Sequence, residues 1–252
     1  MSNVPVFGAD PEFLFIRNNK IVPAHEIVAD GECGFGCDGH PATGEVRPGY
    51  SSNILEVLAK IERCIKMGDL KLKIGDKVDR MVAGHYKHNE PLGGHIHIAQ
   101  EGIGGSRIWQ PIAKALDLYL ENCLEDILSD PDERRQRTNR GYGRTFEEDR
   151  GAVRTKGPHR IEYRSPGSWI VSPNLSYAYL YVAKAIMVVW KKGMRLPAVE
   201  TYDQKLDALL DLVSRVKKIT RSKDMEIGAE VLKEVLNERV DWNADMREEW
   251  IG

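Results

Sequence analysis

The most constraining feature of this chain is a set of four short segments in which polar and non-polar residues alternate. Their polar positions are Asp10 and Glu12, Glu45 and Arg47, His95 and His97, and Arg160, Glu162 and Arg164. Side chains at positions i and i+2 of a β-strand project from the same face, about 6.5–7 Å apart. The intervening residues are apolar, aromatic or turn-forming, so the opposite face would pack against helices. The pattern predicts one sheet whose second face gathers carboxylate, imidazole and guanidinium groups.

Other segments show helical periodicity or turn composition. Apolar residues recur at helical spacing within 51–67, 109–128 and 173–192, and two further amphipathic helices are expected near the C-terminus. The first of these helices can be capped by Ser51 or Ser52. The glycine-rich segment 30–44 and the arginine- and glycine-rich segment 132–157 are predicted to be loops. The expected fold class is α+β, with a curved, mainly antiparallel sheet and helices packed on its outer face.

Composition and charge limit the classes of function. The 36 lysines and arginines nearly balance 38 aspartates and glutamates, so neither a nucleic-acid-binding nor a membrane-surface protein is indicated. No apolar run approaches the roughly 18–20 residues of a transmembrane helix, and the N-terminus lacks a signal-peptide pattern. The four cysteines have no paired CxxC spacing, which favours reduced thiols in a cytoplasm. Cys33 and Cys37 flank a Gly-Phe-Gly loop and are an alternative pair of metal ligands.

The polar face favours chemistry on phosphates. Any one of the alternating pairs would by itself be an ordinary solvated strand face, but four together favour a site. Carboxylates with one or two histidines suit Mg²⁺ or Mn²⁺ better than catalytic Zn²⁺. The many arginines between residues 140 and 164 add groups that bind carboxylates and phosphates bidentately. Because no Walker A, kinase glycine-rich or Rossmann motif is present, a nucleotide would be held by the sheet, its metal ions and the arginine loop.

The motifs, and the order in which they occur along the chain, resemble those of glutamine synthetases. Residues 8–15, Gly-Ala-Asp-Pro-Glu-Phe-Leu-Phe, are similar to the acidic strand of that family, and residues 93–97, Gly-Gly-His-Ile-His, to its Gly-x-His-x-His strand. Asn139 to Arg144 resembles its Asn-Arg loop, and residues 160–166 resemble its Arg-Ile-Glu-x-Arg-x-Pro strand. The strongest likeness, over roughly residues 7–190, is to the small bacteriophage ligases called COOH–NH2 ligase type 2, which are amidoligases.

The resemblance implies a fold, an activity and partners. Residues 1–195 would form a glutamine synthetase-like ligase domain, and residues 196–252 a C-terminal helical extension packed on the same domain. The implied activity is an ATP- and Mg²⁺- (or Mn²⁺-) dependent ligation of a carboxylate to an amine through an acyl-phosphate. Both substrates would be small molecules or peptides. The protein would work in the cytoplasm, that of the host cell if a phage encodes it, and a homo-oligomer is compatible with the sequence.

The resemblance also assigns roles to individual residues. The implied metal ligands are Asp10, Glu12, Glu45, His95 and Glu162. The implied nucleotide-binding residues are Arg140, Arg144, Arg150, Arg154 and Arg160. The implied substrate-binding residues are Glu45, Arg47, His97 and Arg164, and the implied catalytic residues are Glu162, Arg160, Arg164, Arg140 and Arg144. Glutamine synthetases supply several carboxylates from mid-chain, where this sequence matches only at Glu45, so the number of metal ions stays open.

Two alternatives remain at the level of sequence. A phosphotransferase of the guanidino-kinase kind would use a similar sheet and arginine set, and would release a phosphorylated product instead of an amide. A catalytically inactive ligase-fold protein could serve as a binding or inhibitor module, because a fold does not determine a function. Binding of Mg-ATP separates this second alternative from an enzyme.

Overall fold

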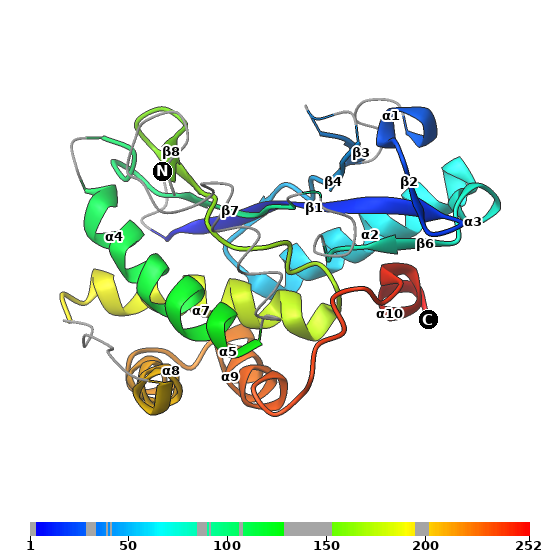
Figure 1. The fold of residues 1–252 in the computed structure, drawn as a ribbon. Coiled ribbons are helices and arrows are strands. Elements are labelled where there is room, and N and C mark those ends of the chain that lie inside the picture. The colour runs from blue at the N-terminus through cyan, green and yellow to red at the C-terminus, as the bar shows by residue number, and fades with distance from the viewer. Residues whose placement is uncertain are drawn as a thin grey trace.

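One long strand organises the sheet. The computed structural model describes residues 4–28, 34–38, 40, 42–84, 90, 92–105, 108–128, 153–194 and 202–252. Within these ranges the sheet has nine strands, and every pairing is antiparallel. The main order is β3(Phe35–Cys37), β4(Gly44–Val46), β1(Val6–Arg17), β7(Gly94–Ala99), β9(Arg160–Tyr163) and β8(Val153–Thr155). Strands β2(Lys20–Val22), β5(Tyr50–Ser51) and β6(Arg80–Val82) also pair with β1, which runs through the middle of Figure 1.

Most of the described helices gather on one side of this sheet (Figure 1). They are α2(Ile54–Leu72), α4(Trp109–Leu116), the π-helical segment η2(Asp117–Glu125), α5(Asp126–Leu128), α7(Pro173–Lys191), α8(Tyr202–Ile219), α9(Lys223–Val235) and α10(Met246–Ile251). Two short helices, α1(Ala24–Ile27) and α3(Ile74–Lys77), complete the described set. In Figure 1, α7 lies between the sheet and the pair α8 and α9, so the molecule has a sheet layer and two helical layers.

The alternation within β1 separates core from site. Phe7, Phe13 and Phe15 are fully buried in the main core. Gly8, Asp10 and Glu12 occupy the other set of alternate positions and therefore point to the opposite face. Each buried phenylalanine stabilises the fold by roughly 1.5–3 kcal/mol. A register shift by one residue would bury the carboxylates and expose these rings, so the core determines which face carries the polar groups.

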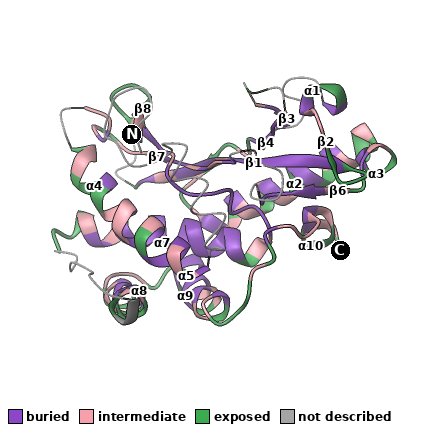
Figure 2. Ribbon diagram, in the orientation of Figure 1, coloured by how far each residue is buried: buried purple, intermediate pink, exposed green. Residues whose placement is uncertain are grey.

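Helix α7 is the central element of the core. Ser172 caps its first turn by accepting a hydrogen bond from the backbone N–H of Leu175, and Pro173 occupies the first helical position. Most of its residues from Leu175 to Val189 are buried, as Figure 2 shows. A helix that is apolar all round must be covered all round, and here the sheet and the helices α8 and α9 cover it.

The expected α+β class and the mainly antiparallel sheet are confirmed. Four predicted details are wrong. The predicted loop 30–44 contains β3, and the predicted loop 132–157 contains β8 near its end. The C-terminal region holds three helices instead of two. The cap of α2 is Asn53, whose side chain accepts from the N–H of Leu55, and not Ser51 or Ser52. Short strands such as β3 are defined by their partners across the sheet, so local composition does not reveal them.

The C-terminal helices pack directly on the rest of the chain. Helices α8 and α9 contact α7, and α10 contacts α2. Inside this interface the Lys184 ammonium of α7 forms an ion pair with the buried Asp224 carboxylate of α9. The division at residue 195 into a ligase domain and an extension stays a prediction. No described helix is long and apolar enough to cross a membrane.

The Asp224 carboxylate is expected to hold three helices together. It accepts hydrogen bonds from Lys184 and from the N–H of Ile54 at the start of α2. Burial raises the pKa of Asp224, but the bonds to Lys184 and Ile54 outweigh it and the pKa is lowered. Asp224→Ala should therefore reduce the free energy of unfolding by about 3 kcal/mol at neutral pH, since it leaves a buried ammonium without its partner.

Urea denaturation at several pH values measures this effect. A carboxyl whose folded pKa is lowered contributes fully above its unfolded pKa of about 3.9, and the contribution is lost as the pH falls through the folded pKa. The difference between the wild type and Asp224→Ala should thus shrink below about pH 4. The control Asp211→Ala removes a half-exposed partner of Arg215 within α8 and should change stability by less than about 0.5 kcal/mol. Equal effects of the two substitutions would contradict the prediction.

Candidate active site

Strand register brings the predicted polar groups to one face. Asp10 of β1 lies opposite His95 of β7, and His97 of β7 lies opposite Glu162 of β9. On the other side of β1, Glu12 lies opposite Glu45 of β4. The residues predicted from four separate segments therefore converge on adjacent strands of a single sheet.

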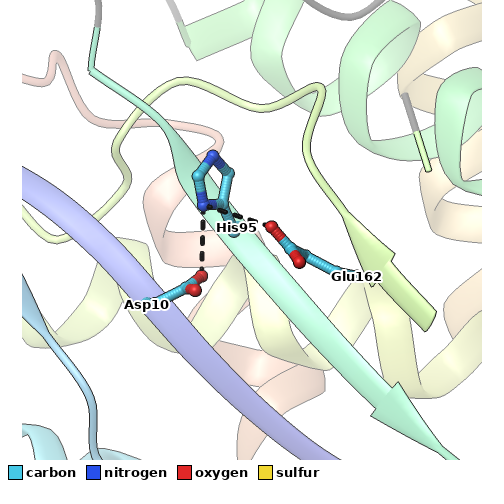
Figure 3. A group of neighbouring side chains, drawn as sticks. All are labelled: Asp10, His95 and Glu162. Atoms are coloured by element: carbon cyan, nitrogen blue, oxygen red, sulfur yellow. Dashed lines mark ion pairs between the residues drawn. The ribbon is translucent and has the colours of Figure 1, made fainter. Parts of the chain in front are cut away.

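Asp10, His95 and Glu162 form the closest group of candidate metal ligands among the described residues. One ligand atom from each lies within 4.8 Å of the others. Nδ1 of His95 is 3.2 Å from Oδ1 of Asp10 and 3.9 Å from Oε1 of Glu162. Figure 3 shows the three side chains, from three neighbouring strands, pointing toward one another.

The two glycines before His95 make room for this arrangement. A Cβ on Gly93 would lie 2.4 Å from Nε2 of His95, and a Cβ on Gly94 would lie 2.1 Å from the carbonyl oxygen of Gly167. The N–H of Gly93 also donates to Oε2 of Glu12 at 2.6 Å. Any larger residue at these positions would displace either the imidazole or the segment that packs beside it. The Gly-Gly-His sequence is thus a steric requirement of the site.

Burial and neighbouring charges set the protonation of the central groups. Burial alone would raise the pKa of Asp10, but its contacts with His95 and His97 outweigh burial and hold the pKa well below its usual value. For His95, burial lowers the pKa, but the bond to Asp10 and the charge of Glu12 together raise it by more, so the net shift is upward. An ionised aspartate beside a basic imidazole is a strongly polar pair that can exchange the imidazole proton for a cation.

A second pair of carboxylates lies beside this group. Burial raises the pKa of Glu12, and burial together with the charge of Asp10 raises the pKa of Glu45 to about 8. Glu45 is only partly compensated by Arg47, which donates to its two oxygens at 3.0 and 2.9 Å. Oε1 of Glu12 is 3.9 Å from Nε2 of His95, on the ring edge away from Asp10. Glu12 and Glu45 thus adjoin the three-residue group without belonging to it.

Cationic side chains surround Glu162. Its carboxylate oxygens lie 3.7 Å from Arg154 Nη1, 3.0 Å from Lys156 Nζ and 3.2 Å from Arg164 Nε. Arg154 lies directly opposite Glu162 in the pairing of β8 with β9. Because one buried carboxylate faces three cations, this side of the site carries excess positive charge that could bind an anion.

The donor set fits a hard divalent cation. Two carboxylates and one imidazole suit Mg²⁺ or Mn²⁺. Their spread is close to the roughly 4.2 Å between opposite ligands of a cation that binds oxygen at about 2.1 Å. Oδ1 of Asp10 and Oε2 of Glu162 are buried and make no hydrogen bond of standard geometry within the described residues. Nδ1 of His95 lies 3.2 Å from the first atom and Nζ of Lys156 lies 3.0 Å from the second, so a cation would compete with these two groups for the oxygens.

Most predicted site residues reach this face, and the roles assigned to them stay predictions. Arg140, Arg144, Arg150 and Cys33 lie outside the described residues. Cys37 is buried in the core, and the close ligand group in the described part of the chain contains no cysteine. Arg47 pairs with Glu45 and also donates to the carbonyl oxygen of Cys37 at 2.8 Å.

Two residues at the site were not predicted, Tyr50 and Lys156. Lys156 continues the alternation of Arg154, so the i and i+2 rule that identified the other strands would have found it. Tyr50 carried no such signal, because its position follows from the pairing of β5 with β1. A third group, the hydroxyl of Ser168, supports the site from behind by donating to the backbone oxygen of Glu12 at 2.5 Å.

Comparison with known proteins places this chain in a family. The family model described as phage phiEco32-like COOH.NH2 ligase-type 2 matches residues 7–251, and so extends through the C-terminal helices. Among curated proteins, none shows significant similarity to this chain.

Two solved structures share the fold. The complex between the prokaryotic ubiquitin-like protein Pup and its ligase PafA has a TM-score of 0.60 at 9% identity, covering 93% of this chain and 63% of the matched chain. Apo GmaS has a TM-score of 0.51 at 14% identity, covering 97% of this chain and 71% of the other. This chain thus spans less than two thirds of the matched chain in the Pup complex. At these identities the likeness shows the fold alone, which is that of the glutamine synthetase-like ligases. Because the family model covers nearly the entire sequence, the chain belongs to the phage phiEco32-like COOH.NH2 ligase-type 2 family of carboxylate–amine ligases.

Proposed function

We propose that this protein joins a carboxylate to an amine at the expense of ATP, through an acyl-phosphate. The observation that carries the proposal is the convergence of Asp10, His95 and Glu162 beside a cluster of cationic side chains. The family assignment supports the same class of reaction. Dependence on ATP and on a divalent cation is the step that goes beyond the family assignment.

The metal-binding part of the proposal rests on the donor set. Asp10, His95 and Glu162 would hold one Mg²⁺ or Mn²⁺ ion, and Glu12 with Glu45 would hold or orient a second. Such an ion neutralises phosphate oxygens and so lowers the barrier to phosphoryl transfer. Burial is the largest cause of the raised pKa values of Glu12 and Glu45, so the ionised form of each carboxylate is poorly stabilised in the protein alone. A bound cation would supply the positive charge that stabilises the ionised form.

The cationic side chains would bind the anions of the reaction. Arg154 and Arg160, together with Arg140, Arg144 and Arg150 of the arginine-rich segment, are proposed to contact the phosphates. Arg164 and Arg47 are proposed to hold the substrate carboxylate, and His97 to line the same part of the site. A guanidinium binds either group through two parallel hydrogen bonds. Lys156 adds a further positive charge close to Glu162.

The proposed chemistry has two steps. In the first, a carboxylate oxygen attacks the γ-phosphorus of ATP and the bond to the β-phosphate oxygen breaks, which yields an acyl-phosphate and ADP. In the second, the amine nitrogen attacks the acyl carbon, inorganic phosphate leaves and the nitrogen loses a proton, which yields the amide. Arginine and lysine side chains would stabilise the charge that develops on phosphate oxygens in both steps.

The substrates are proposed as a small-molecule or peptide carboxylate and a small-molecule or peptide amine. One structural relative was solved in complex with a protein, Pup, of which it is the ligase. A mixture of amino acids, short peptides and polyamines, assayed for ADP release with Mg²⁺ or Mn²⁺, is therefore the appropriate first screen.

Metal binding can be measured without any substrate. Electron paramagnetic resonance of Mn²⁺ should show a tightly bound ion in the wild-type protein. Asp10→Asn should weaken that binding by at least about 100-fold, because loss of a direct ligand exceeds the 10- to 100-fold effect of removing an outer partner. The control Asp211→Asn changes a carboxylate on α8, far from the site in sequence, and should bind Mn²⁺ normally. Equal affinities of the two variants would remove Asp10 from the metal site.

Turnover tests the role of Glu162. With the substrates found by the screen, Glu162→Gln should lower the rate of ADP formation by at least about 100-fold, because loss of a direct metal ligand exceeds the 10- to 100-fold effect of removing an outer partner. The control Glu230→Gln alters an exposed carboxylate that pairs with Lys217 and Lys233. Normal turnover by Glu162→Gln, with circular dichroism spectra that match the wild type, would refute the assignment.

Product analysis tests the reaction class. Mass spectrometry should detect a product lighter by one water than the sum of carboxylate and amine, together with ADP and phosphate in equal amounts. A stable phosphorylated product without an amide would identify a phosphotransferase instead. Failure of calorimetry to detect Mg-ATP binding would favour a binding module.

A further inference from the structure

Tyr50 lies on the polar face of the sheet although no catalytic motif includes it. It begins β5 and pairs with Gly8 of β1. A Cβ on Gly8 would lie 2.8 Å from carbon atoms of the Tyr50 ring, so the glycine is what lets the ring lie against β1. The residue is 37% exposed. Burial in the core therefore does not explain why a tyrosine is placed here.

The Tyr50 hydroxyl joins two predicted site residues. Nη1 of Arg160 donates to this oxygen at 2.5 Å, and the oxygen is 3.1 Å from Nδ1 of His97. The Arg160 guanidinium also lies 5.7 Å from the centre of the Tyr50 ring, within the range of a cation–π interaction. On its other edge, Nε2 of His97 is 2.9 Å from Oδ2 of Asp10.

The chemistry of these groups gives the contacts a direction. A guanidinium only donates, so the Tyr50 oxygen accepts from Arg160 and can direct its own proton to Nδ1 of His97. A carboxylate oxygen only accepts, so at 2.9 Å from Asp10 a bare Nε2 would be repelled and a protonated Nε2 is attracted. Both contacts of the ring favour the same neutral form, with Nε2 protonated and Nδ1 accepting.

We propose that Tyr50 is a positioning residue, which holds His97 as the Nε2–H tautomer and thereby orients Asp10. With Oδ2 turned toward His97, Oδ1 of Asp10 is directed toward His95, with which it would share a cation. Outer partners of metal-binding carboxylates and histidines commonly fix ligand orientation in this way. The link to a cation rests on the proposed function, whereas the tautomer of His97 is a property of the protein alone.

Arg160 extends this chain of contacts to the anion side of the site. Its buried Nε makes no hydrogen bond within the described residues, so the guanidinium keeps donor capacity after binding Tyr50. An anion that draws Arg160 toward itself would also act on the Tyr50 hydroxyl. Tyr50 thus connects the residue proposed to bind phosphate with a residue proposed to bind the metal.

Nuclear magnetic resonance of ¹⁵N-labelled histidine rings tests the tautomer in metal-free protein. The His97 signal, assigned by its loss in His97→Gln, should show a protonated Nε2 and an accepting Nδ1 in the wild type. In Tyr50→Phe it should shift toward a mixture of tautomers. The control Tyr177→Phe removes a hydroxyl that donates to the Asp224 backbone oxygen, and should leave the His97 signal unchanged. A wild-type His97 that is an imidazolium or an Nδ1–H tautomer, or an unchanged signal in Tyr50→Phe, would overturn the proposal.

Titration with Mn²⁺ alone tests the effect on Asp10. Tyr50→Phe should weaken Mn²⁺ binding by about 10-fold, the low end of the effect of an outer partner, while Tyr177→Phe should not. An unchanged affinity in Tyr50→Phe would break the link between Tyr50 and Asp10. A wild-type protein that binds no Mn²⁺ would contradict the proposed function, and the resonance experiment would still decide the tautomer.

Discussion

The pairing of β1 with five other strands is the constraint on which the site depends. Its odd-numbered positions insert Phe7, Phe13 and Phe15 into the core, so its register cannot slip without exposing them. Asp10 and Glu12 are therefore held on the opposite face by the packing of their neighbours. In this way the free energy of apolar burial keeps several carboxylates together, although their mutual repulsion would separate them.

The site that results is electrostatically incomplete. Glu162 faces three cationic groups, whereas Glu12 and Glu45 remain short of positive charge, and burial raises the pKa of both. A surface of this kind has one region suited to phosphate and another suited to cations. Mg-ATP carries both charges in one ligand, which is why the proposed reaction accounts for the whole arrangement better than a metal or an arginine cluster would separately.

Much of this site could be read from alternation. The pairs in β1, β7 and β9 were predicted to share a face, and their register brings Asp10, His95 and Glu162 together. The segments that were predicted incorrectly, β3 and β8, are three residues long and gain their conformation from β4 and β9. Tyr50 escaped prediction for the same reason, since only its partner across the sheet, Gly8, explains its place.

The amino-acid sequence by itself determined which side chains share a face of each strand, where the helices within 51–67, 109–128 and 173–192 form, and which chemistry the polar groups favour. These properties depend on the periods of the strand and the helix, which are local. Only the tertiary structure decided that Asp10 contacts both His95 and His97, that Tyr50 joins His97 to Arg160, and that Glu12 and Glu45 form a pair beside the close ligand group. Those contacts depend on strand order and register, which the packing of distant residues determines.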